Sequence, residues 1–301
     1  MCWTAYCLIY RAITPILLGY HPLGFIRRTR YYAPGWTLWG AITAQLTRYC
    51  FPKATGREYE EVGQFVAENL PTSYAYILVD GEPARPGFEG GQLRYGKLFA
   101  AEFEARFITS LGQTAISPQS LTAFNRSLYE TEVLSAYDLR DGEPIRWQFT
   151  LYIRQPWQTT DSRLKELTAA DVLAAIEKLT LGGDRRYGLG LVKREGEPKP
   201  QETRGREWPE AGDGDSEVRV LRAHVPIEHL SGKVVRGRVE AIPWRWWKNA
   251  AGQSVWGPGQ LRKVQVFYIP GSQVQLPTWR PVVGPRGIWL TEKSDASPAS
   301  P

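Results

Sequence analysis

The chain has 301 residues, enough to bury a sizeable core in one large domain or two smaller ones. Its 29 glycines, 22 prolines and 12 tryptophans favour many turns and a strand-rich α+β fold, and argue against an all-helical protein. The formal net charge is +6. No run approaches the roughly 20 apolar residues of a membrane span, so we expect a soluble protein with no membrane contact.

The positive charge is concentrated at the start of the chain. Residues 1–57 contain no aspartate or glutamate but seven lysines and arginines, which predicts a polyanionic partner for this segment. The three cysteines, Cys2, Cys7 and Cys50, have neither zinc-ligand spacing nor an even number for disulfides. We therefore expect free thiols in a cytoplasmic protein, no metal and no cofactor.

The first half of the chain alternates strand and helix signals. A buried strand is expected at 6–14, followed by a basic loop and a Pro34-Gly35 turn that opens a helix. A polar stretch at 114–141 separates two later strands. The further elements expected are helices at 38–49, 58–69 and 164–179, and strands at 74–79, 97–108 and 146–153.

The second half begins with a glycine-rich loop at 181–192 and becomes hydrophilic at 193–217, which we interpret as a linker or solvated excursion. Strand-like runs at 218–225, 233–242 and 263–269 indicate a β-rich C-terminal module. The tail is rich in serine, proline and alanine and is expected to be disordered. The predicted organisation is a domain at 1–192, the linker, a module at 218–291 and a tail at 292–301.

The glycine-rich loop reads LGGDRRYGLGLV and places two arginines between two glycine pairs. It lacks the GK[ST] ending of a Walker loop, and it follows a predicted helix rather than the strand that a dinucleotide fingerprint requires. Two interpretations remain. The backbone amides and guanidiniums could hold phosphates, or the segment could be a tight surface turn with two solvated arginines.

Three motifs in the same order resemble the RAMP superfamily of CRISPR proteins. Residues 32–41 (YAPGWTLWGA) are similar to the family pattern Y-I-P-G-S-S-L-[KR]-G-A. Residues 182–190 (GGDRRYGLG) are similar to GG-x-[RK]-x-x-G-[FLY]-G, and 123–132 (AFNRSLYETE) contain an element like L-[FY]-x-x-E. The resemblance extends over about 8–192 and is poor beyond Lys193.

The resemblance implies ferredoxin-like (RRM-like) modules that hold guide RNA through the basic loop, the helix that follows Pro34-Gly35 and the glycine loop. It also implies a thumb-like segment near 114–141 that inserts into the guide. The residues implied as RNA contacts are His21, Arg27, Arg28, Arg30, Lys53, Asn125, Arg126, Gly183, Arg185, Arg186 and Gly188.

Catalysis is not expected from these motifs. The RAMP subunits that cleave target RNA use an acidic residue after the first strand, and this chain has none between Thr14 and Gly56. His21 could serve a metal-independent endoribonuclease that processes crRNA, although a general acid–base cut normally needs a second group. His224 and His229 do not form a metal-ligand set. We therefore assign no catalytic residue.

The predicted function is a non-catalytic crRNA-binding subunit of a type III-like CRISPR effector, either Cas-five-like or Cas-seven-like. Its expected partners are crRNA, the large subunit, the backbone RAMP subunits and, through the guide, a target nucleic acid. Two alternatives remain: the endoribonuclease that uses His21, and a scaffold that does not touch RNA, in which the Arg27, Arg28 and Arg30 cluster is solvated.

Overall fold

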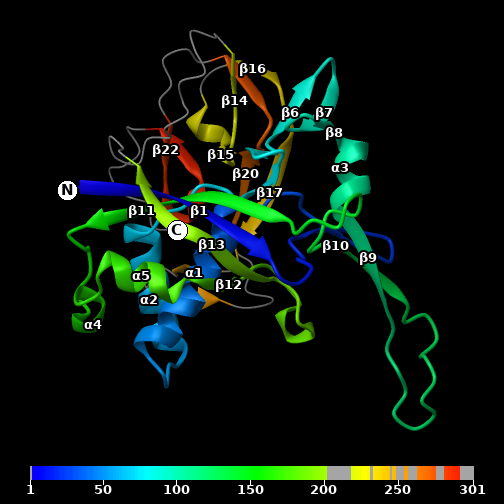
Figure 1. The fold of residues 1–301 in the computed structure, drawn as a ribbon, viewed down its shortest axis with the longest axis horizontal. Helices are drawn as coiled ribbons and strands as arrows, with labels where there is room; N and C mark the ends of the chain where they lie inside the picture. The colour runs from blue at the N-terminus through cyan, green and yellow to red at the C-terminus, as the bar shows by residue number, and fades with distance from the viewer. Residues whose placement is uncertain are drawn as a thin grey trace.

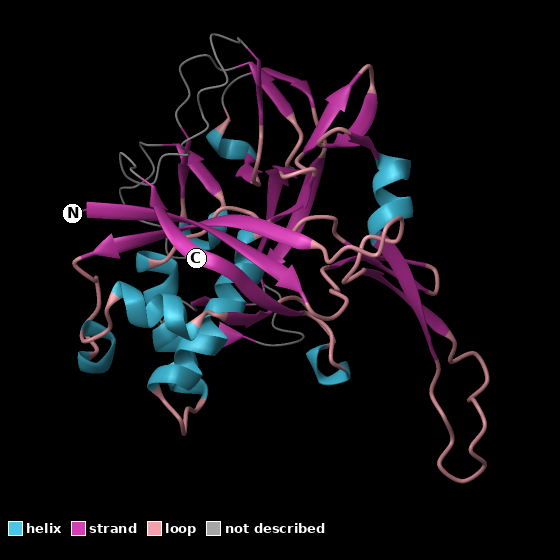
Figure 2. Ribbon diagram, in the orientation of Figure 1, coloured by secondary structure: helices cyan, strands magenta, loops and turns pink. Residues whose placement is uncertain are grey.

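A computed structural model describes residues 2–201, 218–230, 233–244, 246–248, 254–256, 263–275 and 281–291. Its centre is a six-stranded antiparallel sheet (Figures 1 and 2). The longest pairing joins the first strand to the strand at 146–155, in register from Cys2 opposite Gln155 to Arg11 opposite Arg146. In spatial order the strands are β12 (Lys178–Thr180), β13 (Leu191–Gln201), β1 (Cys2–Ala12), β11 (Arg146–Gln155), β4 (Tyr76–Val79) and β5 (Glu82–Pro83).

Helices cover one face of this sheet, as Figure 2 shows in cyan. They are α1 (Gly35–Cys50), α2 (Gly56–Asn69), α4 (Ser162–Lys165) and α5 (Ala169–Ala175). In α1 the buried residues Leu38, Ile42 and Leu46 recur every four positions, so they lie on one side of the helix. They share a core with Trp147 and Leu151 of β11, which explains why this helix forms here.

The opposite face of the sheet is covered by the C-terminal part of the chain, whose strands β14 (Val218–Val220), β16 (Lys233–Arg236) and β22 (Pro281–Val283) lie away from the helices in Figure 1. Tyr76 and Tyr152 of the central sheet pack there against Val225 and Val274. The sheet is therefore buried on both faces. The remaining C-terminal elements are β15 (Val225–Pro226), β17 (Val239–Trp244), β18 (Trp246–Lys248), β19 (Ser254–Trp256), β20 (Lys263–Tyr268), β21 (Gln273–Gln275), β23 (Trp289–Thr291), η2 (Ile227–His229) and η3 (Pro285–Gly287).

A second sheet carries a long arm. Its order is β2 (Gly19–Leu23), β3 (Ile26–Thr29), β10 (Tyr129–Leu134) and β9 (Ile108–Gln113). β9 and β10 form an antiparallel pair, and the connection between them projects far from the rest of the molecule in Figure 1. A smaller sheet of β6 (Pro86–Glu89), β7 (Gln92–Tyr95) and β8 (Leu98–Phe99) precedes α3 (Ala100–Phe107).

Three expectations about the elements were wrong. The strand expected at 97–108 is mostly α3, because Phe103 and Phe107 are one helical turn apart and both are buried. The single helix expected at 164–179 is divided into α4, α5 and β12. Residues 193–201 belong to β13, which pairs with β1, instead of forming a linker.

The mixed α+β class is confirmed. The expected excursion at 202–217 and the expected disordered tail at 292–301 lie outside the described residues. Within the described ranges, no helix is both long and apolar enough to cross a membrane.

Candidate nucleic-acid interface

The glycine-rich loop between β12 and β13 is fastened to the connection that follows β1. The amide of Gly183 donates to the carbonyl of Leu17 (2.9 Å), and the amide of Gly190 donates to that of Pro15 (2.8 Å). A β-carbon on Gly182 would lie 2.0 Å from the Leu17 oxygen, so only glycine permits this approach. The loop is therefore a tethered structure whose backbone is fixed against β1.

This tethering changes the expected role of two glycines. Gly183 and Gly188 were expected to offer their amides to phosphates, but both amides are hydrogen-bonded within the protein, the second to the carbonyl of Arg185 (3.1 Å). The arginines of the loop are exposed in the short 3₁₀ helix η1 (Arg185–Tyr187). Hydrogen bonds to a phosphate at this loop would therefore come from the side chains of Arg185 and Arg186.

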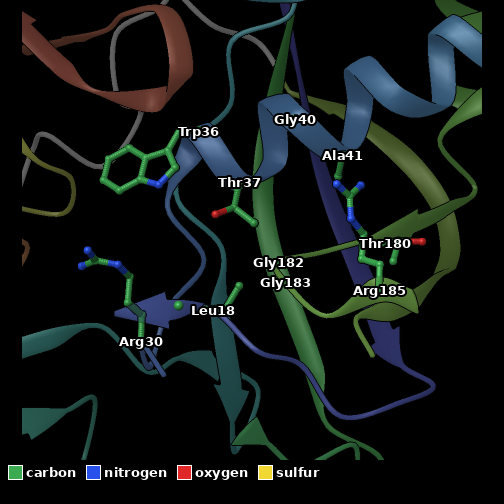
Figure 3. A pocket seen from close by; sticks show the side chains of 11 residues that line it. Leu18, Arg30, Trp36, Thr37, Gly40, Ala41, Thr180, Gly182, Gly183 and Arg185 are labelled. Atoms are coloured by element: carbon green, nitrogen blue, oxygen red, sulfur yellow. The ribbon is translucent and has the colours of Figure 1, made fainter. Parts of the chain in front are cut away.

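The loop and the start of α1 together enclose a cavity of about 280 Å³ (Figure 3). Arg185 extends toward Ala41 on one side, while Arg30 and Trp36 lie on the other, with Gly182 and Gly183 between them. The first turn of α1 contains no acidic residue, and its cap, Pro34, makes no side-chain hydrogen bond. A helix N-terminus without a competing carboxylate favours an anion.

The β2–β3 hairpin places further basic side chains beside this loop. Arg27 lies 3.9 Å from Asp184 of the loop and 4.5 Å above the ring of Tyr129, yet 55% of its side chain stays exposed. Arg28 bonds to the Tyr31 hydroxyl (2.9 Å) and lies 3.5 Å from Glu132. The structure therefore brings Arg27, and less directly Arg28, to the same region as the glycine loop.

Arg30 differs from its neighbours, because its guanidinium is used inside the protein. It forms a two-point ion pair with Glu240 of β17, and only 11% of its side chain is exposed. Its guanidinium also lies over Tyr20 (4.6 Å). We expected a direct RNA contact from Arg30, but this pairing leaves it mainly a structural link between the end of the β2–β3 hairpin and β17 of the C-terminal part.

His224 completes the buried network around this ion pair. Its Nε2 is 3.2 Å from Glu240, and its Nδ1 is 2.8 Å from the hydroxyl of Tyr74. Because an ionised carboxylate only accepts, Nε2–H donates to Glu240 while Nδ1 accepts from Tyr74. Burial lowers the pKa of His224, and Glu240 opposes this shift only in part. A neutral imidazole therefore fits this arrangement.

The lowered pKa of His224 predicts that stability falls in mild acid. Below about pH 6.5 the unfolded chain binds a proton at this histidine that the folded chain does not, which favours unfolding by up to about 1.4 kcal/mol per pH unit. Between pH 7 and 5 the urea-derived free energy of unfolding is expected to decrease less in a His224→Gln variant than in the wild type. Equal pH dependence in the two proteins would contradict the buried neutral imidazole.

The remaining expected site residues lie apart from this cavity's lining. His21 is exposed on β2, with its ring 4.0 Å from that of Tyr20. Lys53 is exposed in the connection between α1 and α2. Asn125 and Arg126 are exposed in the connection between β9 and β10, where Arg126 has a positive φ of 60°. The arm thus carries these two residues away from the cavity between the glycine loop and α1.

Sequence reasoning missed the network partners of Arg30. Glu240 and His224 lie in a part of the sequence where the family resemblance was poor, and neither belongs to a motif. Trp36 and Thr37 line the cavity and belong to the motif at 32–41. The sequence could therefore have indicated them, because this motif opens the helix after Pro34-Gly35.

The fold has known counterparts, although no protein-family model and no curated protein matches the chain. A chain in the cryo-EM structure of the type III-B Cmr-beta bound to cognate target RNA and AMPPnP is similar to it, with a TM-score of 0.53 and 12% identity. The similarity covers 89% of this chain and 86% of that one. This protein has the fold of a Cmr-beta chain.

A second Cmr-beta structure, bound to cognate target RNA, gives the same result, with a TM-score of 0.52, 13% identity and the same coverage of 89% and 86%. At these identities the likeness establishes the fold. It agrees with the resemblance to CRISPR RAMP proteins drawn from the three motifs, and it extends beyond residue 192, where the motifs ended.

Proposed function

We propose that this protein is a non-catalytic crRNA-binding subunit of a type III CRISPR effector that holds the guide's backbone. The observation that carries the proposal is the cavity between the glycine loop and the start of α1. There the Arg185 guanidinium and a helix N-terminus without an acidic residue face the same space. Arg27 and Arg186, exposed nearby, extend this positive region.

The proposed ferredoxin-like module rests on strand order. In chain order, β1, β4, β11 and β13 alternate with helices as β-α-β-β-α-β, with α1 after β1 and α5 after β11. In the sheet they lie as β13-β1-β11-β4, which is fourth, first, third, second. We propose this module as the RAMP domain of 1–192, now continued to 201, with 218–291 as the β-rich C-terminal module.

Because the sheet is buried, contacts to the RNA backbone fit this structure better than stacking of bases on the sheet. RRM domains stack bases on the open face of their sheet. Here that face is covered, since Tyr76 and Tyr152 pack against C-terminal residues such as Val225 and Val274. RNA can then bind at the loops at the end of the sheet. In a guide complex base pairing carries the sequence information, so backbone contacts suffice.

The direct test is the salt dependence of RNA binding by the full chain. Wild type is expected to bind a single-stranded CRISPR repeat-derived RNA with affinity that falls steeply as salt rises. The Arg185→Ala/Arg186→Ala variant is expected to reduce the slope of log K against log salt by about 1 to 2 units, because about 0.7 unit is lost for each phosphate contact.

The matched control is Arg140→Ala/Arg163→Ala, which removes the same charge from two exposed arginines that do not line the cavity. This control is expected to retain the wild-type slope. An equal loss of slope in both double variants would mean that only net charge matters. Salt-independent binding, or none, would reject the proposal, and cleavage of the RNA that is lost in His21→Ala would favour the endoribonuclease.

A further inference from the structure

A second and larger cavity, of about 830 Å³, lies between α1 and α2. Trp39 and Thr43 line it from α1, and Tyr59, Glu60 and Gly63 line it from α2. Arg186 of the glycine loop borders it as well. This volume is in the range of cavities that enclose small organic ligands, and the phosphate-backbone role proposed above does not use it.

The walls of this cavity, which we call the α1–α2 groove, are held by contacts between the two helices and within α1. Trp39 Nε1 donates to the carbonyl of Gly63 (2.7 Å), and a β-carbon on Gly63 would lie 3.1 Å from the Trp39 ring. The hydroxyl of Thr43 donates to the carbonyl of Trp39 (2.7 Å). The aromatic wall is therefore fixed in place before any ligand binds, which lowers the entropic cost of binding there.

The α1–α2 groove adjoins the smaller cavity between the glycine loop and α1, where the proposed function places an RNA phosphate. Both are lined by Gly40, Thr180 and Arg185. A β-carbon on Gly40 would find no atom within 4 Å, so nothing fills the space above this residue. Arg185 therefore stands between a site suited to phosphate and a site suited to a flat, largely apolar group.

We propose that one unpaired nucleotide of the bound RNA inserts its base into the α1–α2 groove while its phosphate stays beside Arg185. This inference rests on the proposed RNA-binding function and adds a base-binding subsite to it. Tyr59 and Trp39 line the groove and offer ring surface for a nucleobase, with the guanidinium of Arg286 over the Trp39 ring at 4.9 Å from its centre. Arg48, Arg185 and Arg186 line the groove and can bond to the adjoining phosphates.

Three arginines line the groove, and Glu60 is its single carboxylate, so the α2 wall is where a hydrogen-bond donor of a base fits. The carboxylate of Glu60 forms no ion pair or hydrogen bond with any residue that the structure describes. It repels anions and only accepts hydrogen bonds. Guanine offers it two neighbouring donors, N1–H and the N2 amino group, whereas uracil offers only N3–H. The groove therefore favours guanine over uracil.

The test compares two single-stranded probes, octauridylate and the same octamer with one central guanosine, on the full-length protein. Wild type is expected to bind the guanosine probe about tenfold more tightly, with the same salt slope for both probes. Glu60→Gln is expected to reduce the guanosine preference without weakening octauridylate binding, because the phosphate contacts are unchanged.

Ala44→Leu provides the steric arm of the test. Ala44 of α1 lines the groove but not the smaller cavity beside the glycine loop, and leucine favours a helix nearly as well as alanine does. The variant is expected to abolish the guanosine preference while thermal unfolding and the octauridylate salt slope stay at wild-type values. Loss of the fold in this variant would leave Glu60→Gln to decide.

The outcomes separate this inference from the proposed function. Salt-dependent binding of both probes with equal affinity, or a guanosine preference unchanged in Ala44→Leu and Glu60→Gln, would overturn the base subsite and leave RNA binding intact. A reduced salt slope in Ala44→Leu would show that the groove holds phosphate, which also overturns the base subsite. Failure of both probes to bind would reject the proposed function itself.

Discussion

Substitution of Gly182 by alanine is expected to lower the free energy of unfolding by more than about 3 kcal/mol. The new β-carbon would lie 2.0 Å from the backbone oxygen of Leu17, which cannot move aside like a flexible side chain. The residue also has φ of +77°, a conformation that costs an L-residue about 1–2 kcal/mol. Urea-induced unfolding of wild type and variant measures the loss.

Gly188→Ala is the matched control, because it separates backbone strain from the steric clash. Gly188 has nearly the same φ, +82°, but a β-carbon there would meet no atom within 4 Å. Alanine at this position is expected to cost only the conformational strain, about 1–2 kcal/mol. A similar loss of unfolding free energy in the two variants would show that the close approach of Gly182 to Leu17 does not stabilise the loop.

The Gly182 variant should also affect RNA binding. Gly182 lies three residues before Arg185 and beside the amide of Gly183, which anchors the loop to Leu17. A displaced loop would move the Arg185 guanidinium away from α1, so the salt slope is expected to fall toward that of Arg185→Ala/Arg186→Ala. Gly188→Ala should retain the wild-type slope.

The sequence predicted those elements whose signals are local. The helix after Pro34-Gly35 was expected at 38–49 and is found at Gly35–Cys50, because its buried residues recur with helical spacing. The strand expected at 146–153 is β11 (Arg146–Gln155), whose apolar run is long and bounded. In both cases one segment contains enough information to specify its own conformation.

Elements that depend on distant partners were not predictable in the same way. Residues 193–201 are hydrophilic and contain Pro198 and Pro200, so they resembled a linker. They form a strand because β1 provides a partner nearly 200 residues earlier in the chain, in pairs such as Tyr10 with Arg194. Pairing across the sheet here outweighs the local preference.

The candidate site was predictable only in part, for the same reason. The motifs identified Arg185 of the glycine loop and the helix start, which the fold does bring together around one cavity. They could not show that the amides of Gly183 and Gly188 are already bonded, nor that Arg30 pairs with an acid 210 positions away. A motif indicates which residues are used, whereas tertiary contacts decide what each one does.

The ion pair of Arg30 and Glu240 gives the other large expected effect. Glu240→Ala is expected to destabilise the protein by about 3–5 kcal/mol, because it leaves the buried guanidinium without its two-point partner. His224 would lose its acceptor in the same variant. A double variant, Arg30→Met/Glu240→Leu, removes both charges and is expected to recover much of the loss, since apolar residues can replace a buried pair.

The double-mutant cycle decides whether the pair acts as a unit. If the effects of Arg30→Met and Glu240→Leu on the free energy of unfolding were additive in the double variant, the two charges would be energetically independent, and this ion pair would not link the β2–β3 hairpin to β17. A large coupling energy would show that burial makes each charge depend on the other.

The pH dependence of stability provides an independent check on this ion pair. Burial opposes ionisation of Glu240, but hydrogen bonds from Arg30 and His224 outweigh it and lower the pKa of this carboxyl to about 2. Its stabilising effect is complete above the ordinary glutamate pKa and is lost as the pH falls from about 4.5 toward 2. In a His224→Gln background, where the coupled titration of the histidine is absent, the stability gap between the parent and its Glu240→Leu variant should therefore be constant from pH 5 upward and narrow below pH 4.5. A gap that does not narrow would mean that Glu240 is not ionised in the folded protein.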